Sequence, residues 1–178
     1  FVLPLKTAIN SIYYRIRNNI CNGEEIEEKV ALLHSDTLSM YLENFDGEDN
    51  DKILSYYENS KKFSIPLNIT TPDQIFDFVF RSKGFEFKNA MMSYSKVVID
   101  EIQAYSPELL ATLIRGIQDI IEIGGKVSIF TATFPPFIKD LLVVENLDYL
   151  DKQEQKYKFI TKEFTNDVKR HNVKILDE

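Results

Sequence analysis

The stretch Val97-Val98-Ile99-Asp100-Glu101 decides the fold class of this 178-residue chain. Its three β-branched residues predict a short buried strand, and the two carboxylates predict that the strand ends there in a loop. Downstream, Ser106-Pro107 begins a helix with a wide apolar face, and Gly124-Gly125 ends it. A second strand follows over residues 126–130 and ends at Thr131-Ala132-Thr133. A strand, a helix and a strand in this order predict two parallel strands.

The part of the chain before residue 97 also alternates between predicted helices and predicted strands. Apolar residues at helical spacing over 9–20 predict a helix, and apolar runs predict strands at 30–33 and 66–69. Thr71 is expected to cap a further helix that begins at Pro72 and continues to Phe80. We therefore predict the α/β class, with an open, mainly parallel sheet and flanking helices.

Polar residues follow each of the four predicted strands, namely His34-Ser35, Thr70-Thr71, Asp100-Glu101 and Thr131-Ala132-Thr133. Because parallel strands place their carboxyl ends at one edge of a sheet, we expect all four groups to share that edge. Ligands of open α/β sheets bind outside this edge. The sequence therefore predicts a functional site there.

Two adjacent carboxylates at a strand end suit magnesium and water chemistry. Asp100 could hold a hydrated Mg²⁺ ion, and Glu101 could orient or deprotonate a water that attacks a phosphate. Thr131 and Thr133 could hydrogen-bond these carboxylates from the neighbouring strand end. The simpler alternatives are an acidic turn at the first strand and an ordinary threonine turn at the second.

Composition and charge exclude several classes of protein. Hydrophobic residues make up 44% and charged residues 28% of the chain, as in ordinary globular domains. The net charge of −7 argues against bulk attraction to nucleic acid, so any DNA contact must be local. One cysteine and two distant histidines cannot assemble a closed zinc site, and no glycine begins a phosphate-binding loop. The expected location is the cytoplasm.

Several segments together resemble the superfamily 2 helicases, and one subgroup in particular. Residues 98–103 resemble the DExx or Walker B box, and Thr131-Ala132-Thr133 resembles motif III. Residues 3–16 resemble motif Ia of the CRISPR-associated helicase-nuclease of type I systems. The strand that ends at His34-Ser35 and the segment Thr71-Pro72-Asp73-Gln74 resemble further parts of that family, in the same order.

This resemblance implies ATP and Mg²⁺ as cofactors and assigns roles to individual residues. Asp100 would bind the Mg²⁺ of Mg-ATP through water, and Glu101 would activate the attacking water. Thr131 and Thr133 would couple the nucleotide state to DNA, with Gln103 standing where many relatives carry His or Asp. A single-stranded DNA track would comprise Pro4, Lys6, Thr7, His34, Ser35, Thr71, Asp73 and Gln74. For His34, a hydrogen-bonded position at the strand end is the alternative.

The family also implies a larger parent protein. Residues 1–150 would be a partial first RecA-like lobe without its phosphate loop, and residues 151–178 a connector toward a second lobe. The parent would be an ATP-dependent helicase and single-stranded DNA translocase in CRISPR interference, recruited by an RNA-guided surveillance complex and joined to an HD nuclease domain. This chain alone would be inactive, because the phosphate loop normally holds the β and γ phosphates. The strand at 126–130 would lack the neighbour that the phosphate-loop strand provides.

Three other interpretations stay open at this point. The chain could be a non-catalytic α/β binding module, or a lobe of another superfamily 2 translocase. An unrelated carboxylate-metal hydrolase would need more clustered acids or histidines than Asp100-Glu101 supplies.

Overall fold

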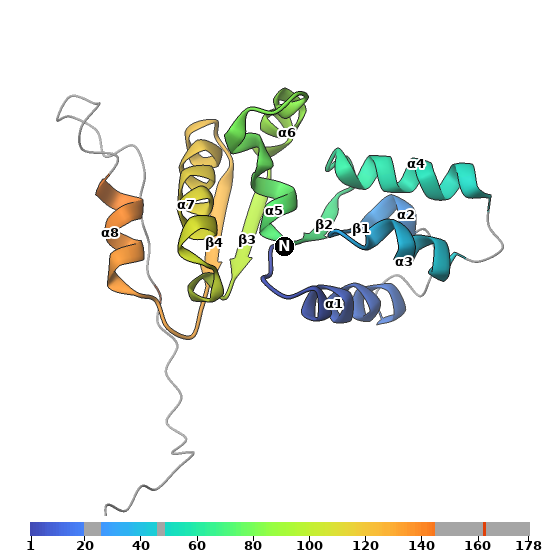
Figure 1. The fold of residues 1–178 in the computed structure, drawn as a ribbon, viewed down its shortest axis with the longest axis horizontal. Coiled ribbons are helices and arrows are strands. Elements are labelled where there is room, and N and C mark those ends of the chain that lie inside the picture. Colours follow the sequence, from blue (N-terminus) through green and yellow to red (C-terminus); the bar gives the residue numbers. More distant parts are fainter. Residues whose placement is uncertain (20–25, 46–48, 145–161, 163–178) are drawn as a thin grey trace, which may run out of the picture.

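The computed structural model describes residues 1–19, 26–45, 49–144 and 162 of the chain. Helices and strands alternate along it (Figure 1). The strands are β1 (Val30–Leu33), β2 (Leu67–Thr70), β3 (Lys96–Asp100) and β4 (Lys126–Phe130). The α-helices are α1 (Lys6–Asn19), α2 (Ile26–Lys29), α3 (Thr37–Asn44), α4 (Asn50–Lys61), α5 (Pro72–Ile75), α6 (Phe85–Met92), α7 (Pro107–Glu122) and α8 (Pro136–Val144). Two 3₁₀ helices are η1 (Phe76–Phe80) and η2 (Ile102–Ala104).

Residues 1–3 join two parallel pairs of strands into one sheet. β1 pairs with β2, and β3 pairs with β4, both in parallel. Between these pairs, Val2 forms parallel bridges to Thr70 on one side and to Ile99 on the other. The spatial order is therefore β1, β2, residues 1–3, β3 and β4. The predicted α/β class is confirmed, and the arrangement is that of a partial RecA-like lobe.

Helix α7 covers the β3–β4 pair with its apolar face. Ser106 caps the helix, because its hydroxyl accepts a hydrogen bond from the Leu109 amide at 3.4 Å. Gly124 follows the helix with a φ of +105°, a conformation that favours glycine. The buried residues of this helix are Leu110, Leu113, Ile114, Gly116, Ile117 and Ile120. Burial of this face holds β3, and with it Asp100, in place.

Gly116 lies where α7 and η1 approach each other closely. A Cβ atom at this position would lie 2.2 Å from Cδ1 of Phe76. We expect Gly116→Ala to lower the free energy of unfolding by about 1–3 kcal/mol through overpacking, despite the better helix propensity of alanine. Urea unfolding would measure this change, with Ala111→Ser on the exposed side of α7 as a near-neutral control. An unchanged midpoint in Gly116→Ala would contradict the close packing.

Tyrosine hydroxyls seal the outer edge of β1. The Leu33 carbonyl accepts a hydrogen bond from the residue that follows β2, so the Leu32 amide and carbonyl face the opposite side. The Tyr41 hydroxyl of α3 accepts from that amide and donates to that carbonyl, both at 2.8 Å. The Tyr56 hydroxyl of α4 donates to the Val30 carbonyl in the same way. Because these groups occupy the bonding positions of a further strand, the sheet ends at β1.

The other edge of the described sheet is different. Lys126, Ser128 and Phe130 are exposed on one face of β4, while Val127 and Ile129 are half-buried against α7. Within the described residues, no strand pairs with the outer edge of β4. Only one of the two faces of β4 is therefore packed against the core.

The segment after β2 differs from the expected continuous helix. The α-helix ends at Ile75 and continues as a 3₁₀ helix, whose tighter turn rotates Phe80 to a position with 70% of its surface exposed. Thr71 occupies the N-cap position, as expected, but its side chain makes no capping hydrogen bond. Its Oγ1 atom is buried and has no hydrogen-bond partner among the described residues.

Other differences concern elements that the sequence pattern did not indicate. Helices α3 and α6 were not predicted. The predicted connector at 151–178 lies outside the described residues, except for Lys162. No helix of the described residues is long and apolar enough to cross a membrane.

Candidate functional site

The strand ends gather at one edge of the sheet, as the sequence predicts. In the parallel register, Asp100 of β3 lies beside Phe130 of β4, so Glu101 and Thr131 follow neighbouring strand ends. Leu33 of β1 lies beside Thr70 of β2 in the same sense. The edge thus has two parts. Asp100 and Glu101 form one part, and the residues that follow Leu33 and Thr70 form the other.

Glu101 adopts a left-handed conformation with a φ of +52°. Its amide donates to the Asp100 carboxylate at 3.0 Å and to the Phe130 carbonyl at 2.9 Å. A residue other than glycine in this region stores strain, and such strain clusters at functional sites. The two hydrogen bonds hold the turn, and the sequence alone gave no sign of it.

A chain of hydrogen bonds joins the ends of β3 and β4. The Gln103 amide nitrogen donates to the Glu101 carboxylate, and the Gln103 amide oxygen accepts from the Thr131 hydroxyl. The Thr131 hydroxyl also lies 2.7 Å from the Thr133 carbonyl and accepts from the Thr133 amide at 3.2 Å. Among the described residues, neither threonine hydroxyl bonds a carboxylate directly, contrary to the expectation, and Gln103 instead links the Glu101 carboxylate to the Thr131 hydroxyl.

Asp100 fits a magnesium ion held largely by water. Its Oδ1 atom accepts the Glu101 amide, whereas no described residue hydrogen-bonds Oδ2. In the described part of the chain, no three His, Cys, Asp or Glu side chains form a cluster that could hold a metal. Mg²⁺ keeps several waters and needs one or two carboxylates beside substrate phosphates, so a single available carboxylate oxygen suits it.

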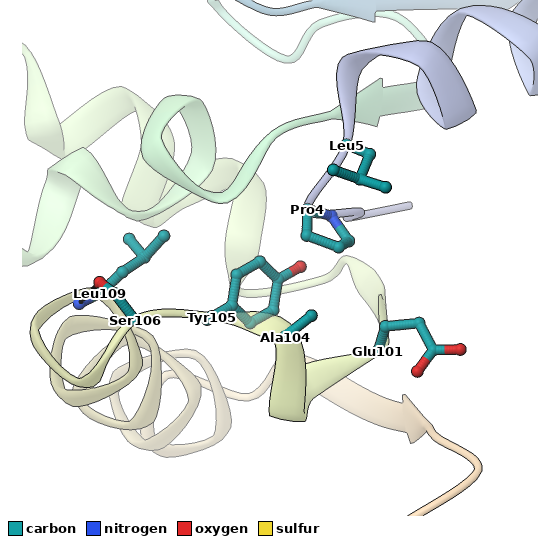
Figure 2. Close-up of a pocket in the computed structure, with 7 residues that line it drawn as sticks. All are labelled: Pro4, Leu5, Glu101, Ala104, Tyr105, Ser106 and Leu109. Atoms are coloured by element: carbon teal, nitrogen blue, oxygen red, sulfur yellow. Dashed lines mark hydrogen bonds between the residues drawn. The ribbon is translucent and has the colours of Figure 1, made fainter.

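Tyr105 contacts the backbone at the end of β3. Its hydroxyl donates to the Asp100 carbonyl at 3.4 Å. Burial raises the pKa of the Tyr105 hydroxyl, and the nearby Asp100 charge raises this pKa further, so the phenol stays protonated. Figure 2 shows the Tyr105 ring between Pro4 and Ala104, with Glu101 at one end of the pocket and Leu109 at the other. Sequence reasoning gave Tyr105 no role, although Ala104-Tyr105 comes directly after the DExx segment.

The second part of the edge joins α1 to the end of β1. The Lys6 ammonium donates to the Ser35 hydroxyl and to the Asp36 carboxylate, the latter at 2.8 Å. The Ser35 hydroxyl also donates to Asp36 at 2.9 Å. These hydrogen bonds lower the pKa of the Asp36 carboxyl, chiefly through Lys6 and then through Ser35. Asp36 was not among the residues predicted for the DNA track. Its position directly after Ser35 in the sequence could have indicated it.

His34 is buried, with 3% of its surface exposed, and both ring nitrogens have partners. Nδ1 accepts the Asp36 amide at 3.1 Å, so Nε2 carries the proton and donates to Asn10 Oδ1 at 2.9 Å. The alternative interpretation, a hydrogen-bonded histidine at the strand end, describes this geometry. His34 therefore positions Asn10 and Asp36 and presents little surface of its own.

The buried ring predicts a dependence of stability on pH. Burial lowers the pKa of His34 below its usual value of 6.5, and Lys6 lowers it too, whereas Asp36 and Asp73 oppose the shift. Because the unfolded chain binds the proton first, the free energy of unfolding should fall as the pH drops below 6.5. Thermal unfolding at pH 7.5, 6.5 and 5.5 would measure the loss. His34→Gln should flatten the curve in this window, and a slope equal to that of the unchanged chain would contradict the assignment.

The remaining residues of the predicted DNA track lie near His34 but differ in exposure. Thr71 is buried, while Asp73 is exposed and Gln74 half-buried, and the Gln74 amide donates to the Asp73 carboxylate at 2.7 Å. Pro4 is half-buried and Thr7 exposed. The exposed polar side chains of the track are thus Lys6, Thr7, Ser35 and Asp73, and Gln74 adds a half-buried amide.

Lys88 of α6 anchors the α5 segment and was missed by sequence reasoning. Its ammonium donates to the Gln74 carbonyl at 2.7 Å and to the Asp77 carboxylate at 2.6 Å. It also lies 5.3 Å from the centre of the Phe63 ring. Because α6 itself was not predicted, the sequence held no signal for this contact.

Comparison with known proteins supports the family resemblance. No family model matches the chain, and no solved structure matches it significantly. A curated protein of Methanothermobacter thermautotrophicus, the CRISPR-associated nuclease/helicase Cas3, is 28% identical over 154 residues, which are 85% of this chain. The chain spans about a fifth of the length of that relative, since the match covers 18% of it. This similarity confirms the resemblance to CRISPR-associated helicase-nucleases, and it extends over most of the chain.

Proposed function

We propose that this chain supplies the DExx part of an ATP-dependent single-stranded DNA translocase that acts in CRISPR interference. The observation that carries the proposal is the hydrogen-bonded connection from Glu101 through Gln103 to Thr131. It joins the two strand ends that resemble the Walker B box and motif III. An acidic turn without function would not require a link to the neighbouring strand end.

The chain's own residues divide the work on the nucleotide. ATP with Mg²⁺ supplies the phosphoryl group that is transferred to water, and Asp100 would hold the ion through water. The Glu101 carboxylate accepts a proton from the attacking water or orients it. Gln103 keeps the carboxylate oriented, and the hydroxyl of Thr131 fixes the Gln103 amide in turn. The sequence contains no phosphate-binding loop, so these residues form only one part of a complete site.

The other part of the edge would follow the DNA backbone. Lys6, Thr7 and Ser35 offer one cation and two exposed hydroxyls, which suit phosphate contacts without sequence preference. Asp36 partly neutralises Lys6, so the local attraction is weak, in line with the net charge of −7. His34 and Thr71 support this surface from inside.

Further partners are proposed from the relative's name, which describes a CRISPR-associated nuclease/helicase. They comprise an RNA-guided surveillance complex, the phosphate-loop segment, a second RecA-like lobe and an HD nuclease domain. The relative is much longer than this chain, which leaves room for such parts in a parent protein.

The test is ATP hydrolysis by a natural full-length protein that contains this lobe together with a phosphate-binding loop. We expect Mg²⁺-dependent turnover that single-stranded DNA stimulates and that double-stranded DNA of equal length stimulates less. Turnover without any DNA dependence would support the binding-module interpretation instead. DNA degradation by the same protein would then be measured with and without the surveillance complex. If single-stranded DNA stimulates ATP turnover but DNA degradation does not depend on the complex, the result would favour another superfamily 2 translocase.

A further inference from the structure

Two adjoining hollows lie between the turn after β3, the start of α7 and the α5–η1 segment. The first has a volume of about 390 Å³ and is the pocket of Figure 2, lined at its ends by Glu101 and Leu109. The second has a volume of about 330 Å³ and is lined by Asp73, Phe80 and Glu108, among others. Both include Ser106 and Leu109 in their walls, so they meet at the first turn of α7. We refer to them together as the acidic groove.

The walls of the acidic groove carry charge of one sign. Its acidic residues are Asp73, Asp77, Glu101 and Glu108. None of the residues that line the two hollows is lysine, arginine or histidine. Lys88 lies outside the groove and pairs with Asp77 at 2.6 Å, and within the described residues the other three carboxylates form no ion pair. Such walls attract a cationic segment.

The acidic groove also exposes large apolar side chains. Leu5 is 62% exposed in the first hollow, and Phe80 is 70% exposed in the second. Leu109 lies in the shared wall and is half-buried. The 3₁₀ turn of η1, which rotates Phe80 out of the core, creates this surface at the expense of buried apolar area. Aromatic side chains in this kind of setting commonly anchor protein partners.

We propose that the acidic groove docks a basic segment of a partner protein that carries apolar side chains between its cations. The apolar side chains contact Phe80 and Leu109, and the cations face Asp73 and Glu108. Because Glu101 lies at one end, the docked partner sits beside the proposed ATP-hydrolysis residues. The docking surface is independent of the proposed function, since it would exist whether or not the chain takes part in ATP hydrolysis.

The test uses fluorescence anisotropy with a fluorescein-labelled nonapeptide that alternates lysine and leucine, added to the full chain. We expect saturable binding that weakens as salt increases, and weaker binding of a peptide with serine in place of leucine. Phe80→Ser should weaken binding of the lysine-leucine peptide about tenfold, and Glu108→Gln a few-fold. The matched controls are Phe87→Ser and Glu86→Gln, because Phe87 is also 70% exposed and Glu86 also lies in the first turn of its helix.

Each other outcome overturns the proposal. Equal weakening in all four variants would show general attraction to an acidic protein. No binding at low salt would show that the groove has no affinity for basic segments. If labelled oligo-dT binds and loses affinity in Phe80→Ser, the groove belongs to DNA. If the free chain dimerises in sedimentation experiments and Phe80→Ser abolishes the dimer, a second copy fills it. Peptide binding can fail while DNA-stimulated ATP hydrolysis remains, so the two proposals are separable.

Discussion

Glu101→Gln is expected to lower the DNA-stimulated ATP turnover of the full-length protein by about 10²- to 10⁴-fold, the usual contribution of a general base. The substitution removes the basic carboxylate and keeps its size. A glutamine carbonyl can still accept the hydrogen bond from the Gln103 amide, so the connection to Thr131 should persist. Binding of Mg-ATP should therefore change little while turnover falls.

The measurement combines steady-state turnover with binding of a fluorescent ATP analogue in the same variant. Glu122→Gln provides the matched control, because this residue lies exposed near the end of α7, away from the strand ends. It should retain full turnover. A Glu101→Gln protein with unchanged turnover would reduce Asp100-Glu101 to an acidic turn and give the lead to a non-catalytic binding module.

Tyr41→Phe is expected to cause the largest loss of stability, about 2–5 kcal/mol, because it leaves two buried backbone groups of Leu32 without a partner. The ring itself would remain stacked on Tyr56, at 4.3 Å between centroids, so the loss reports the hydroxyl alone. Burial raises the pKa of the Tyr41 hydroxyl, which keeps its proton available for the Leu32 carbonyl.

Urea unfolding monitored by circular dichroism would measure this loss. Tyr14→Phe is the matched control, since the Tyr14 hydroxyl bonds only the half-buried Asn44 side chain in the described structure, where water can replace it. We expect a change of about 1 kcal/mol or less for the control. Equal changes in the two variants would show that the β1 edge does not depend on Tyr41.

The sequence predicted the sheet well because its strands are short apolar runs bounded by strong turn signals. The strand from Lys96 to Asp100 and the helix begun by Ser106-Pro107 are clear examples. Helix α6 escaped prediction because its aromatic residues do not form one buried face, and Phe87 points into solvent. The 3₁₀ turn at Phe80 escaped it because α-helical spacing was assumed beyond Ile75.

The sequence predicted which residues form the candidate site, but not their backbone conformations or the directions of their side chains. Asp100 ends a strand, and Glu101 and Thr131 directly follow strands, so parallel topology alone brings them to one edge. The left-handed turn at Glu101 and the side-chain direction of Gln103 depend on η2, which has no strong sequence signal. Likewise, burial of His34 depends on the packing of α1 through Asn10, a contact 24 residues away in the chain.

The two edges of the sheet differ, because tyrosine hydroxyls cover the edge at β1, whereas no strand in the described part of the chain pairs with the edge at β4. A strand from another chain, or a stray segment during folding, finds hydrogen-bonding positions at β1 already occupied by the hydroxyls of Tyr41 and Tyr56. At β4 no described strand occupies them. Larger assemblies and aggregates alike should therefore nucleate on one side only, and losing the Tyr41 hydroxyl would open a second, competing nucleation edge.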